Sequence, residues 1–409
     1  MALKLDFLTK EIYIKLITKG LGVFRTLYLL LFFSISTALD NFYFAKSIVG
    51  VVILVNILFE ITYSQQLNES KDNLTFIKKF NIILNKASFI LGFILVVISL
   101  LISDNLEIIT HVLMLSLWGI LNINSNYFLL LFRYKELNKR VLSYYLLIAI
   151  FDILLLLLIL NFLESKNSFF LISVSLLISE FLVFMLLFSK FFLSSYKNGN
   201  DNSVKLNLKK TTLYKVFLIL VVISLIDISD KFFLSFLGKG QITYYTYGLY
   251  APLMIRQSLD IRSNFFVQIN QAESLNHIKL IFYKTLKRLA PFFFLGVIIL
   301  ISVTELFEEV IKNTFHIENI IVFKNIVYLG ILITPLYMLW DLFYRFYYRE
   351  KKIHTLIKIV FVGFIINIVL NYLLGFSLSW GIYGILVSTL IVFLFYNLLS
   401  FRYFFIKNK

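Results

Sequence analysis

Ionisable side chains inside long apolar stretches are the residues of this chain that could do chemistry. They gather in the first two apolar stretches and again in the seventh and eighth. They are Arg25, Lys46 and Glu60 in the first group, with Asp40 at the turn between its two stretches, and Asp227, Asp230, Lys231 and Arg256 in the second. An ionisable group in hydrocarbon costs about 2.5–3.5 kcal/mol and usually faces a cavity or a partner. Such cations could bind an anionic substrate, and such acids could hold an ion or a counter-charge.

Arg25 is the strongest of these candidates because it lies near the middle of its apolar stretch. The planar guanidinium suits an anionic headgroup such as a phosphate. The alternative is an ion pair with an acid of the other half at matching depth, such as Asp227. Both interpretations stay open on the sequence alone, so Arg25 is a predicted substrate-binding residue with Lys46, Lys231 and Arg256.

The acids have several interpretations. Asp227 and Lys231 are four residues apart, share a helix face and are expected to neutralise each other. Glu60 could instead be a proton or cation site. Asp260 and Arg256 are also four residues apart, near a cytoplasmic end, where snorkelling and topology explain them.

Three further acids lie away from the two groups. Asp341 and Arg345 share the spacing of a helical pair near a cytoplasmic end, where topology explains them. Asp152 and Glu180 lie in the fifth and sixth stretches. These two could pair with hydroxyls or with each other, so we rank them low as site residues.

Aromatic residues follow Gly238-Lys239-Gly240 at the predicted outer start of a helix. An interfacial belt is one explanation of Tyr244 and Tyr247. A stacking surface for sugars at an outer mouth is the other.

The composition excludes several classes of chemistry. Only 15% of the 409 residues are charged and 60% are hydrophobic, which is unlike a soluble domain. The chain has no Cys, and its four His make no ligand spacing, so we predict no metal site. No phosphate-cradling Gly loop is present. We therefore predict a non-enzyme without a cofactor, which draws on a Na⁺ or H⁺ gradient or on the membrane potential.

The elements that position these residues are apolar stretches long enough to span a bilayer, for which about 20 residues suffice. The sequence predicts twelve of them, at roughly 16–36, 43–64, 81–102, 107–132, 141–161, 169–193, 214–237, 242–264, 287–303, 319–344, 353–373 and 379–401. Of the 39 Lys and Arg, 30 fall at alternate ends and connections and 3 at the others. The positive-inside rule then places both termini in the cytoplasm. This spread over seven segments argues against nucleic acid as a partner.

The longest polar connection, 194–213, divides the twelve stretches into six plus six. We predict an all-α polytopic membrane protein with an N-lobe over 1–193, a cytoplasmic linker over 194–213 and a C-lobe over 214–409. The lobes would be parallel repeats around a central cavity. The charged first helix pair of each lobe would line that cavity.

Local motifs resemble those of a known superfamily. The first-half motifs are Gly22-Val23-Phe24-Arg25, Asp40-Asn41-Phe42-Tyr43-Phe44-Ala45 and Glu60-Ile61-Thr62-Tyr63-Ser64-Gln65. In the second half, residues 230–238, then Ile242-Thr243 and Tyr247, agree. The pattern is similar to the lipid II flippase branch and the polysaccharide-unit (O-antigen type) flippases. Both belong to the multidrug/oligosaccharidyl-lipid/polysaccharide (MOP) exporter superfamily.

The resemblance implies a flippase that moves a polyprenyl-diphosphate-linked oligosaccharide, of O-antigen, lipopolysaccharide or capsule type, to the outer leaflet by alternating access. Arg25 would contact the diphosphate. It implies a monomer in a bacterial plasma membrane that works beside glycan polymerase machinery. Two alternatives remain open: a cation-coupled multidrug exporter of the same superfamily, which would use Asp227 and Glu60, and a membrane polysaccharide polymerase or ligase.

Overall fold

Every long element in the described part of the chain is a helix. The computed structural model describes residues 17–406 apart from 19, 23, 34, 68–73, 103–104, 135–137, 163–169, 198–209, 259–273, 316, 318 and 351. A first apolar helix covers Gly20–Phe33. The helices that follow are α2 (Thr37–Leu67), α3 (Leu74–Ile102), α4 (Leu106–Tyr134), α5 (Asn138–Phe162), α6 (Leu171–Lys197), α7 (Lys210–Ser235), α8 (Gln241–Ser258), α10 (Leu275–Leu306), α11 (Glu308–Phe315), α12 (Ile320–Arg349), α13 (Ile353–Leu370), the π-helical turn η1 (Asn371–Ser377), α14 (Gly381–Phe401) and η2 (Arg402–Ile406).

Each of the twelve predicted stretches coincides with one of these helices over most of its length. The chain is an all-α polytopic membrane protein. Among the described residues, seven helices are long and apolar enough to cross a membrane, and two shorter apolar helices accompany them. Many helices exceed the predicted bounds: α10 begins at Leu275, well before the predicted 287. Hydropathy marks the part of a helix that lies in hydrocarbon, whereas the hydrogen-bonded helix continues into polar surroundings.

One further difference lies in the predicted outer connection at about 304–318. It holds the short helix α11, in which two acids occupy the first turn and Lys312 the last. This charge order suits the helix dipole and stabilises so short an element.

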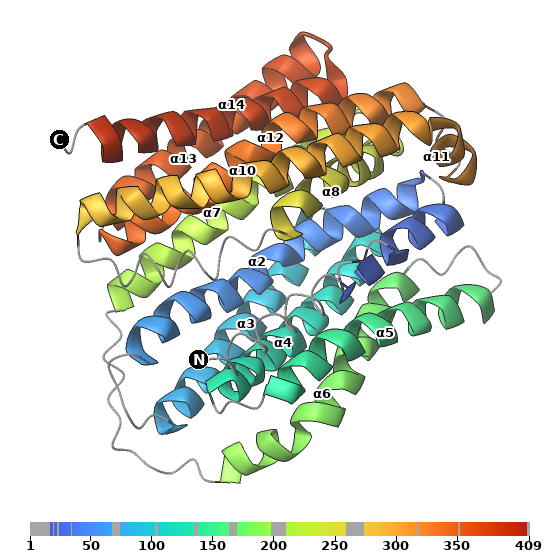
Figure 1. Ribbon diagram of the computed structural model, residues 1–409. Coiled ribbons are helices and arrows are strands. Elements are labelled where there is room, and N and C mark those ends of the chain that lie inside the picture. Colours follow the sequence, from blue (N-terminus) through green and yellow to red (C-terminus); the bar gives the residue numbers. More distant parts are fainter. Residues whose placement is uncertain are drawn as a thin grey trace. The chain divides into compact units, whose positions relative to one another are not determined.

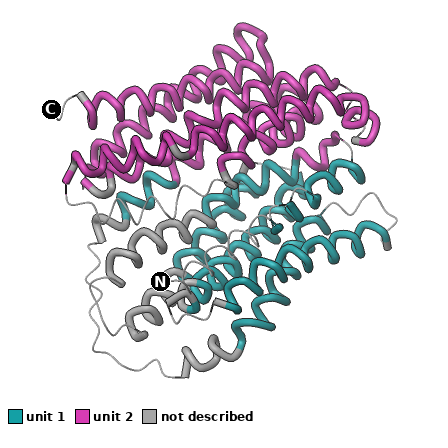
Figure 2. The backbone as a smooth tube through the Cα atoms, in the orientation of Figure 1, with its two compact units in different colours: residues 1–33, 41–220 teal, residues 34–40, 221–409 magenta. Residues whose placement is uncertain are grey.

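The chain divides into two compact units (Figure 2). The first comprises residues 1–33 and 41–220, and the second comprises residues 34–40 and 221–409. The chain therefore passes from the first to the second unit inside α7, beyond the polar connection. The short segment 34–40, which precedes and begins α2, belongs to the second unit.

In the first unit, α4 packs against α3 and α6, and α6 packs against α5. Large aromatic residues fill the contact between these helices. The ring centroids of Phe128 on α4 and Phe188 on α6 lie 5.3 Å apart, and Tyr144 of α5 joins the same cluster. This rigid core positions the polar side chains of α4, α5 and α6 described below.

In the second unit, α12 packs against α8 and α14, and α13 lies beside α14 (Figure 1). The approach of α13 to α14 depends on Gly363. A Cβ added there would lie 2.1 Å from Cε1 of Tyr396, so no larger residue fits without a shift. This tight pair places Asn367 and Thr389 in the interior of the unit.

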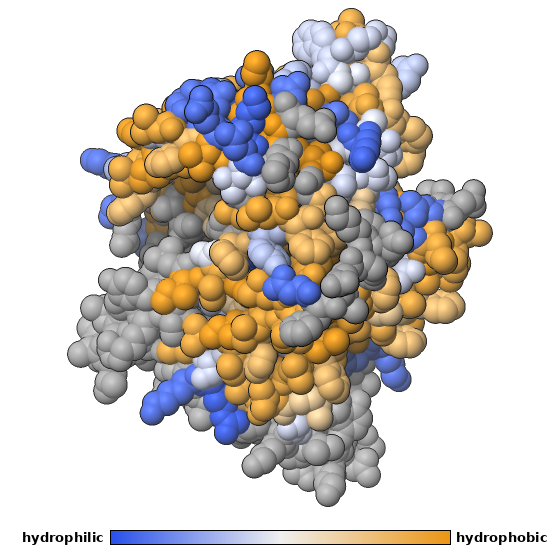
Figure 3. Space-filling view, turned by 90° about the vertical axis from the view of Figure 1, so that its right-hand side faces the viewer, coloured by the Kyte–Doolittle hydropathy of each residue, from blue (hydrophilic) through white to orange (hydrophobic). Residues whose placement is uncertain are grey.

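Hydrophobic side chains dominate the visible surface, and hydrophilic ones gather in separate patches (Figure 3). On α3, Phe89, Phe93 and Leu101 are among the most exposed residues. On α10 the same holds for Phe292 and Phe294. A soluble monomer rarely exposes so much contiguous apolar surface, and hydrocarbon is the solvent that such surfaces fit.

Candidate functional site

A cavity of 290 Å³ lies within the first unit, between the first helix, α4, α5 and α6. Arg25 lines it from the first helix, and Asp152 and Glu180 line it from α5 and α6. Trp118 and Tyr145 are among its aromatic lining residues. A cation, two acids and aromatic rings thus surround one small space in an otherwise apolar bundle.

Arg25 makes an ion pair across this cavity. Its Nε lies 2.6 Å from Oδ2 of Asp152, and the Arg25 residue is only 8% exposed. The pair is incompletely hydrogen-bonded: Nη2 of Arg25 and Oδ1 of Asp152 are buried and have no hydrogen-bond partner among the described residues. Buried polar groups are normally satisfied, so the open donor and acceptor beside this cavity are available to a ligand or to water.

Glu180 is the second acid of the cavity and is 1% exposed. The hydroxyl of Tyr144 donates to its Oε1 at 2.9 Å, and Nδ2 of Asn122 donates to its Oε2 at 3.2 Å. Both carboxylate oxygens are therefore engaged by neutral donors, which hold the side chain at the cavity wall.

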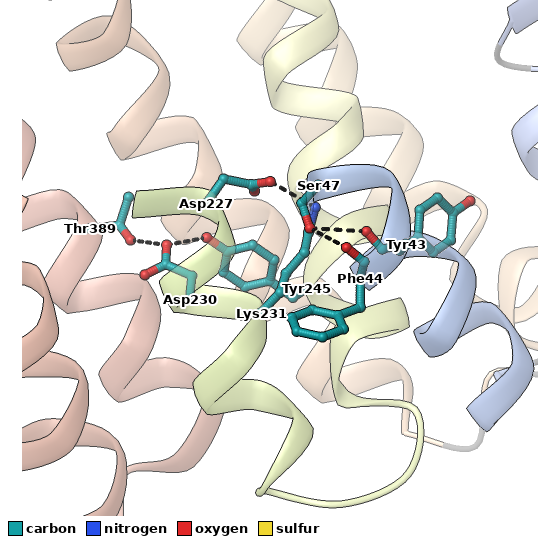
Figure 4. A network of polar contacts seen from close by, with 8 residues as sticks. All are labelled: Tyr43, Phe44, Ser47, Asp227, Asp230, Lys231, Tyr245 and Thr389. Atoms are coloured by element: carbon teal, nitrogen blue, oxygen red, sulfur yellow. Dashed lines mark hydrogen bonds and ion pairs between the residues drawn. The ribbon is translucent and has the colours of Figure 1, made fainter. Parts of the chain in front are cut away.

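The second unit contains a different polar cluster, centred on Asp230 of α7 (Figure 4). The hydroxyls of Tyr245 and Thr389 donate to its Oδ2 at 2.7 and 2.6 Å. The amides of Asn367 and Asn371 donate to its Oδ1 at 3.0 and 2.8 Å. No Lys or Arg within the described ranges forms an ion pair with Asp230, and its four hydrogen-bond donors are all neutral groups.

The end of α13 explains how two amides reach one carboxylate. Asn367 and Asn371 are four residues apart, and the π-helical turn η1 begins at Asn371. Such turns occur frequently at functional sites because they redirect side chains within a helix. The Oδ1 atom of Asn371 is buried without a hydrogen-bond partner among the described residues, which leaves one oxygen available to a ligand.

The predicted pair of Asp227 and Lys231 is present. Lys231 Nζ lies 3.0 Å from Asp227 Oδ2, so this acid has its partner on its own helix. Arg25 likewise has its partner, Asp152, within its own unit. The alternative ion pair between Arg25 and Asp227 stays a prediction.

Asp40 belongs to the second unit and caps the start of α8. Its Oδ1 accepts from the backbone N–H and the hydroxyl of Thr243, at 2.7 and 2.6 Å, and its Oδ2 accepts from Gly240 N–H at 2.6 Å. A carboxylate at a helix N-terminus satisfies otherwise unpaired donors. Gly240 has a φ of +83°, and a Cβ there would lie 2.4 Å from Cγ2 of Ile35. Asp40 is thus a capping residue in this structure.

Arg256 of α8 forms an ion pair with Asp341 of α12. Its Nε donates to Oδ2 at 2.8 Å, and its Nη2 lies 2.7 Å from the same atom. Its guanidinium also lies 4.8 Å from the ring centroid of Tyr337. Asp260, four residues after Arg256, lies outside the described residues, so the helical spacing of these two stays a prediction.

The remaining predicted residues are not among those that line the Arg25 cavity. Lys46 lies over the ring of Phe42, with Nζ 5.8 Å from its centroid. Glu60 is in α2, but its side chain lies outside the described part of the chain. Tyr244 and Tyr247 are 8% and 5% exposed, so neither presents an open stacking face in this structure. The Tyr244 hydroxyl accepts from the backbone N–H of Asn319 at 3.1 Å.

The structure places Asp152 and Glu180, which the sequence ranked low, in the lining of the Arg25 cavity. Asp152 pairs with Arg25 rather than with a hydroxyl or with Glu180. The predicted hydroxyl partner is present for Glu180, at Tyr144. Sequence reasoning also missed Asn367, Asn371 and Thr389. The only signal was a pair of Asn residues four apart in an apolar stretch. Within the described ranges, no group of three or more His, Cys, Asp or Glu residues could hold a metal ion.

Comparison with known proteins completes this description. No family model and no curated protein sequence matches the chain. Among solved structures, the lipid II flippase MurJ in an inward closed conformation aligns with a TM-score of 0.67 at 17% identity, over 96% of this chain and 86% of MurJ. The chain has the fold of MOP-superfamily transporters.

Multidrug transporters of the superfamily share this MOP fold. An inward-facing MATE-family transporter aligns with a TM-score of 0.61 at 13% identity, over 93% of each chain. A eukaryotic MATE transporter aligns with a TM-score of 0.60 at 13% identity, over 98% of this chain and 97% of that one. Solved structures with this fold thus include a lipid II flippase and multidrug transporters.

Proposed function

We propose that this protein is a flippase that moves a polyprenyl-diphosphate-linked oligosaccharide, of the O-antigen or capsule type, from the cytoplasmic to the outer leaflet. The observation that carries the proposal is Arg25. It is a nearly buried guanidinium that lines a cavity and has a donor without a hydrogen-bond partner among the described residues. Arg binds phosphate oxygens through parallel N–H donors, and such charge-assisted bonds are strong in a low-dielectric site.

The physical problem that the site would solve is the passage of a diphosphate through hydrocarbon. A buried charge without a partner costs several kcal/mol even after relaxation. The 290 Å³ cavity suits a phosphate-bearing group rather than a whole oligosaccharide, so the glycan would lie outside it. The lobes predicted at 1–193 and 214–409 would alternate access to the two sides of the membrane.

The Asp230 cluster is the proposed coupling site. One carboxylate, two amides and a Thr hydroxyl supply oxygen atoms of the kind that hard cations such as Na⁺ bind, and a proton could occupy the same carboxylate. The assignment of amide O and N follows from the hydrogen-bond network, so rotation of either Asn would turn an oxygen towards the carboxylate. The residues present therefore fit a Na⁺ or H⁺ gradient as the energy source.

The same cluster favours the second candidate function, a cation-coupled exporter of small molecules. The two functions differ in what accumulates when the protein is missing. A flippase deletion leaves lipid-linked glycan on the cytoplasmic leaflet, whereas an exporter deletion leaves the glycan lipids unchanged and raises sensitivity to toxic compounds.

The test is deletion in the native host, followed by analysis of lipid-linked glycan on each leaflet. Complementation compares the wild type with Arg25→Ala and with Lys324→Gln. Lys324→Gln is the control, because it also removes a cation from ion pairs, in this case with the more exposed acids Glu305 and Glu308. We expect glycan to accumulate inside the deletion and the Arg25→Ala strains, and not in the Lys324→Gln strain. Full glycan display by Arg25→Ala, with normal protein levels, would contradict the proposal.

The cellular setting follows from the same proposal. The protein would be a monomer in a bacterial plasma membrane, with both termini in the cytoplasm, and would pass its substrate to glycan polymerase machinery. Accessibility of tags at each terminus to a membrane-impermeant reagent tests this topology. Labelling of either tag in intact cells would contradict it.

A further inference from the structure

The Arg25 cavity already contains an anion that belongs to the protein. The carboxylate of Asp152 lies beside the guanidinium, 2.6 Å from its Nε, in the space that an external anion would enter. Asp152 also lines the cavity, as Arg25 does. An oxyanion that enters this cavity and binds Arg25 must therefore compete with Asp152.

The pair is built loosely enough for such an exchange. Both side chains are nearly buried, with exposures of 9% and 13%, yet Nη2 of Arg25 and Oδ1 of Asp152 lack hydrogen-bond partners among the described residues. A pair optimised only for stability would satisfy these atoms, because each unsatisfied buried group carries a desolvation penalty. An oxyanion with three or more oxygens could satisfy the guanidinium more completely than one carboxylate oxygen does.

We propose that Asp152 is an internal competitor for Arg25, that an entering oxyanion displaces it, and that the displaced carboxylate takes up one proton. The inference rests on the proposed function only for the identity of the oxyanion, which would be the diphosphate of the lipid-linked substrate. The exchange consumes one proton from solvent and forms one O–H bond on Asp152. The Arg25 guanidinium stays charged throughout.

The reason for proton uptake is the charge left in the cavity. A divalent oxyanion beside Arg25 and an ionised Asp152 would give these three groups a net charge of −2. Protonation of Asp152 reduces this to −1 in a region where each uncompensated charge is costly. Glu180 lies on the same cavity wall and adds to the negative potential if it is ionised.

The titratable groups around Asp152 are few. The first helix supplies Arg25, α6 supplies Glu180, and α5 itself supplies Tyr144 and Tyr145. The lining residues of α4 are Trp118 and Asn122, which do not titrate. Glu180 already accepts from Tyr144 and Asn122, which leaves Asp152 as the acid whose partner is lost when an oxyanion binds.

Sulfate is the probe that isolates this exchange, because it does not titrate between pH 5 and 8. Binding of sulfate to the purified full chain is measured by calorimetry in buffers of different ionisation enthalpy, which also counts the protons taken up. For the wild type we expect about one proton per sulfate. We also expect an affinity that rises towards low pH, by at most about tenfold per pH unit.

The variants separate competition from simple charge effects. Asp152→Asn removes the competitor, so we expect tighter sulfate binding at pH 8, no proton uptake and no dependence on pH. Glu180→Gln is expected to keep the proton uptake, and Arg25→Gln to lose sulfate binding. Asp341→Asn alters the other Arg–Asp pair and is the matched control, with the sulfate affinity and proton uptake of the wild type.

Two results would overturn the proposal. One is sulfate binding to the wild type without proton uptake, which needs no variant and therefore does not depend on how well Asp152→Asn folds. The other is an Asp152→Asn variant that keeps the proton uptake. These results are distinct from failure of the flippase function, which is a deletion strain without glycan accumulation. In that case, proton-linked sulfate binding would still stand and only the transported anion would change.

Discussion

Two arginine–aspartate pairs, one in each unit, join neighbouring helices and differ in how completely they are hydrogen-bonded. In the second unit, Arg256 places Nε and Nη2 on one oxygen of Asp341 and also lies over the ring of Tyr337. In the first unit, Arg25 approaches Asp152 through Nε, and its Nη2 finds no hydrogen-bond partner among the described residues. The looser pair is the more buried one, with exposures of 9% and 13% against 17% and 16%.

The difference in hydrogen bonding between the two pairs indicates which of them has a role beyond stability. Burial makes an unsatisfied charge more costly, so a pair held only for stability should become better bonded as it becomes more buried. The reverse is observed here, and the looser pair is the one that lines the 290 Å³ cavity. Arg256 and Asp341 behave as a structural contact between α8 and α12. Arg25 and Asp152 form the pair whose contact we propose is broken when an oxyanion binds.

The largest expected effect separates the two arginines by transport. Arg25→Ala removes the only cation among the cavity-lining residues, so we expect transport per folded molecule to fall about 10- to 100-fold, the equivalent of a charge-assisted contact. Leaflet-resolved glycan analysis measures it, normalised to membrane-inserted protein. Transport within twofold of the wild type would remove the distinction between the pairs.

The next effect concerns the free energy of unfolding, for which we expect the Arg256–Asp341 pair to matter more than the Arg25–Asp152 pair. Asp341→Asn breaks a well-bonded pair, and we expect it to lower the free energy of unfolding by about 1.5–3 kcal/mol. Asp152→Asn should have a smaller effect, because the guanidinium of Arg25 borders a cavity that water or an anion can enter. Thermal unfolding in detergent compares the two variants. A larger loss for Asp152→Asn would mean that this pair is structural after all.

A third effect concerns Asp230, whose carboxylate has no Lys or Arg partner among the described residues. If Asp230 binds Na⁺, the ion should stabilise the folded protein by about 2.7 kcal/mol at a concentration one hundred times its dissociation constant. Asp230→Asn should abolish this stabilisation, whereas Asp152→Asn should keep it. Unfolding in NaCl against the same ionic strength of choline chloride provides the measurement. Equal Na⁺ protection of wild type and Asp230→Asn would exclude a Na⁺ site there.

The smallest effect is expected for the more exposed ion pairs. Lys324 bonds Glu305 and Glu308 at 2.7 and 2.8 Å, at the end of α10 and the start of α11. Exposed ion pairs contribute little because water solvates the separated charges. Lys324→Gln should therefore leave both transport and thermal unfolding unchanged within error. A clear loss of either would show that contact distance, rather than burial, governs these pairs.

Much of the fold follows from the sequence, because hydrophobic length and charge asymmetry act locally. Each predicted stretch contains a helix, and the helical spacing of Asp227 and Lys231 correctly predicts their ion pair. The partners of Arg25 and Asp230 could not be predicted in this way. Thr389 is 159 residues from Asp230, and nothing in a single sequence indicates that their helices adjoin.

The neutral residues are the hardest to predict. Asn367 and Asn371 carry no charge whose burial would mark them, and only the π-helical turn and the close packing of α13 on α14 direct them towards Asp230. Asp152 is different, since an acid in an apolar stretch is a visible signal. Its pairing with Arg25 could not be predicted, because nothing in a single sequence indicates that the fifth stretch lies beside the first.

The most direct test of the account is a structure determined with selenate, whose selenium can be located by anomalous scattering. We predict a selenium peak in the cavity of the first unit, with a selenate oxygen within hydrogen-bond distance of Nη2 of Arg25 and the contact between Arg25 and Asp152 broken. A cavity without selenium, with the contact between Arg25 and Asp152 still at 2.6 Å, would contradict it.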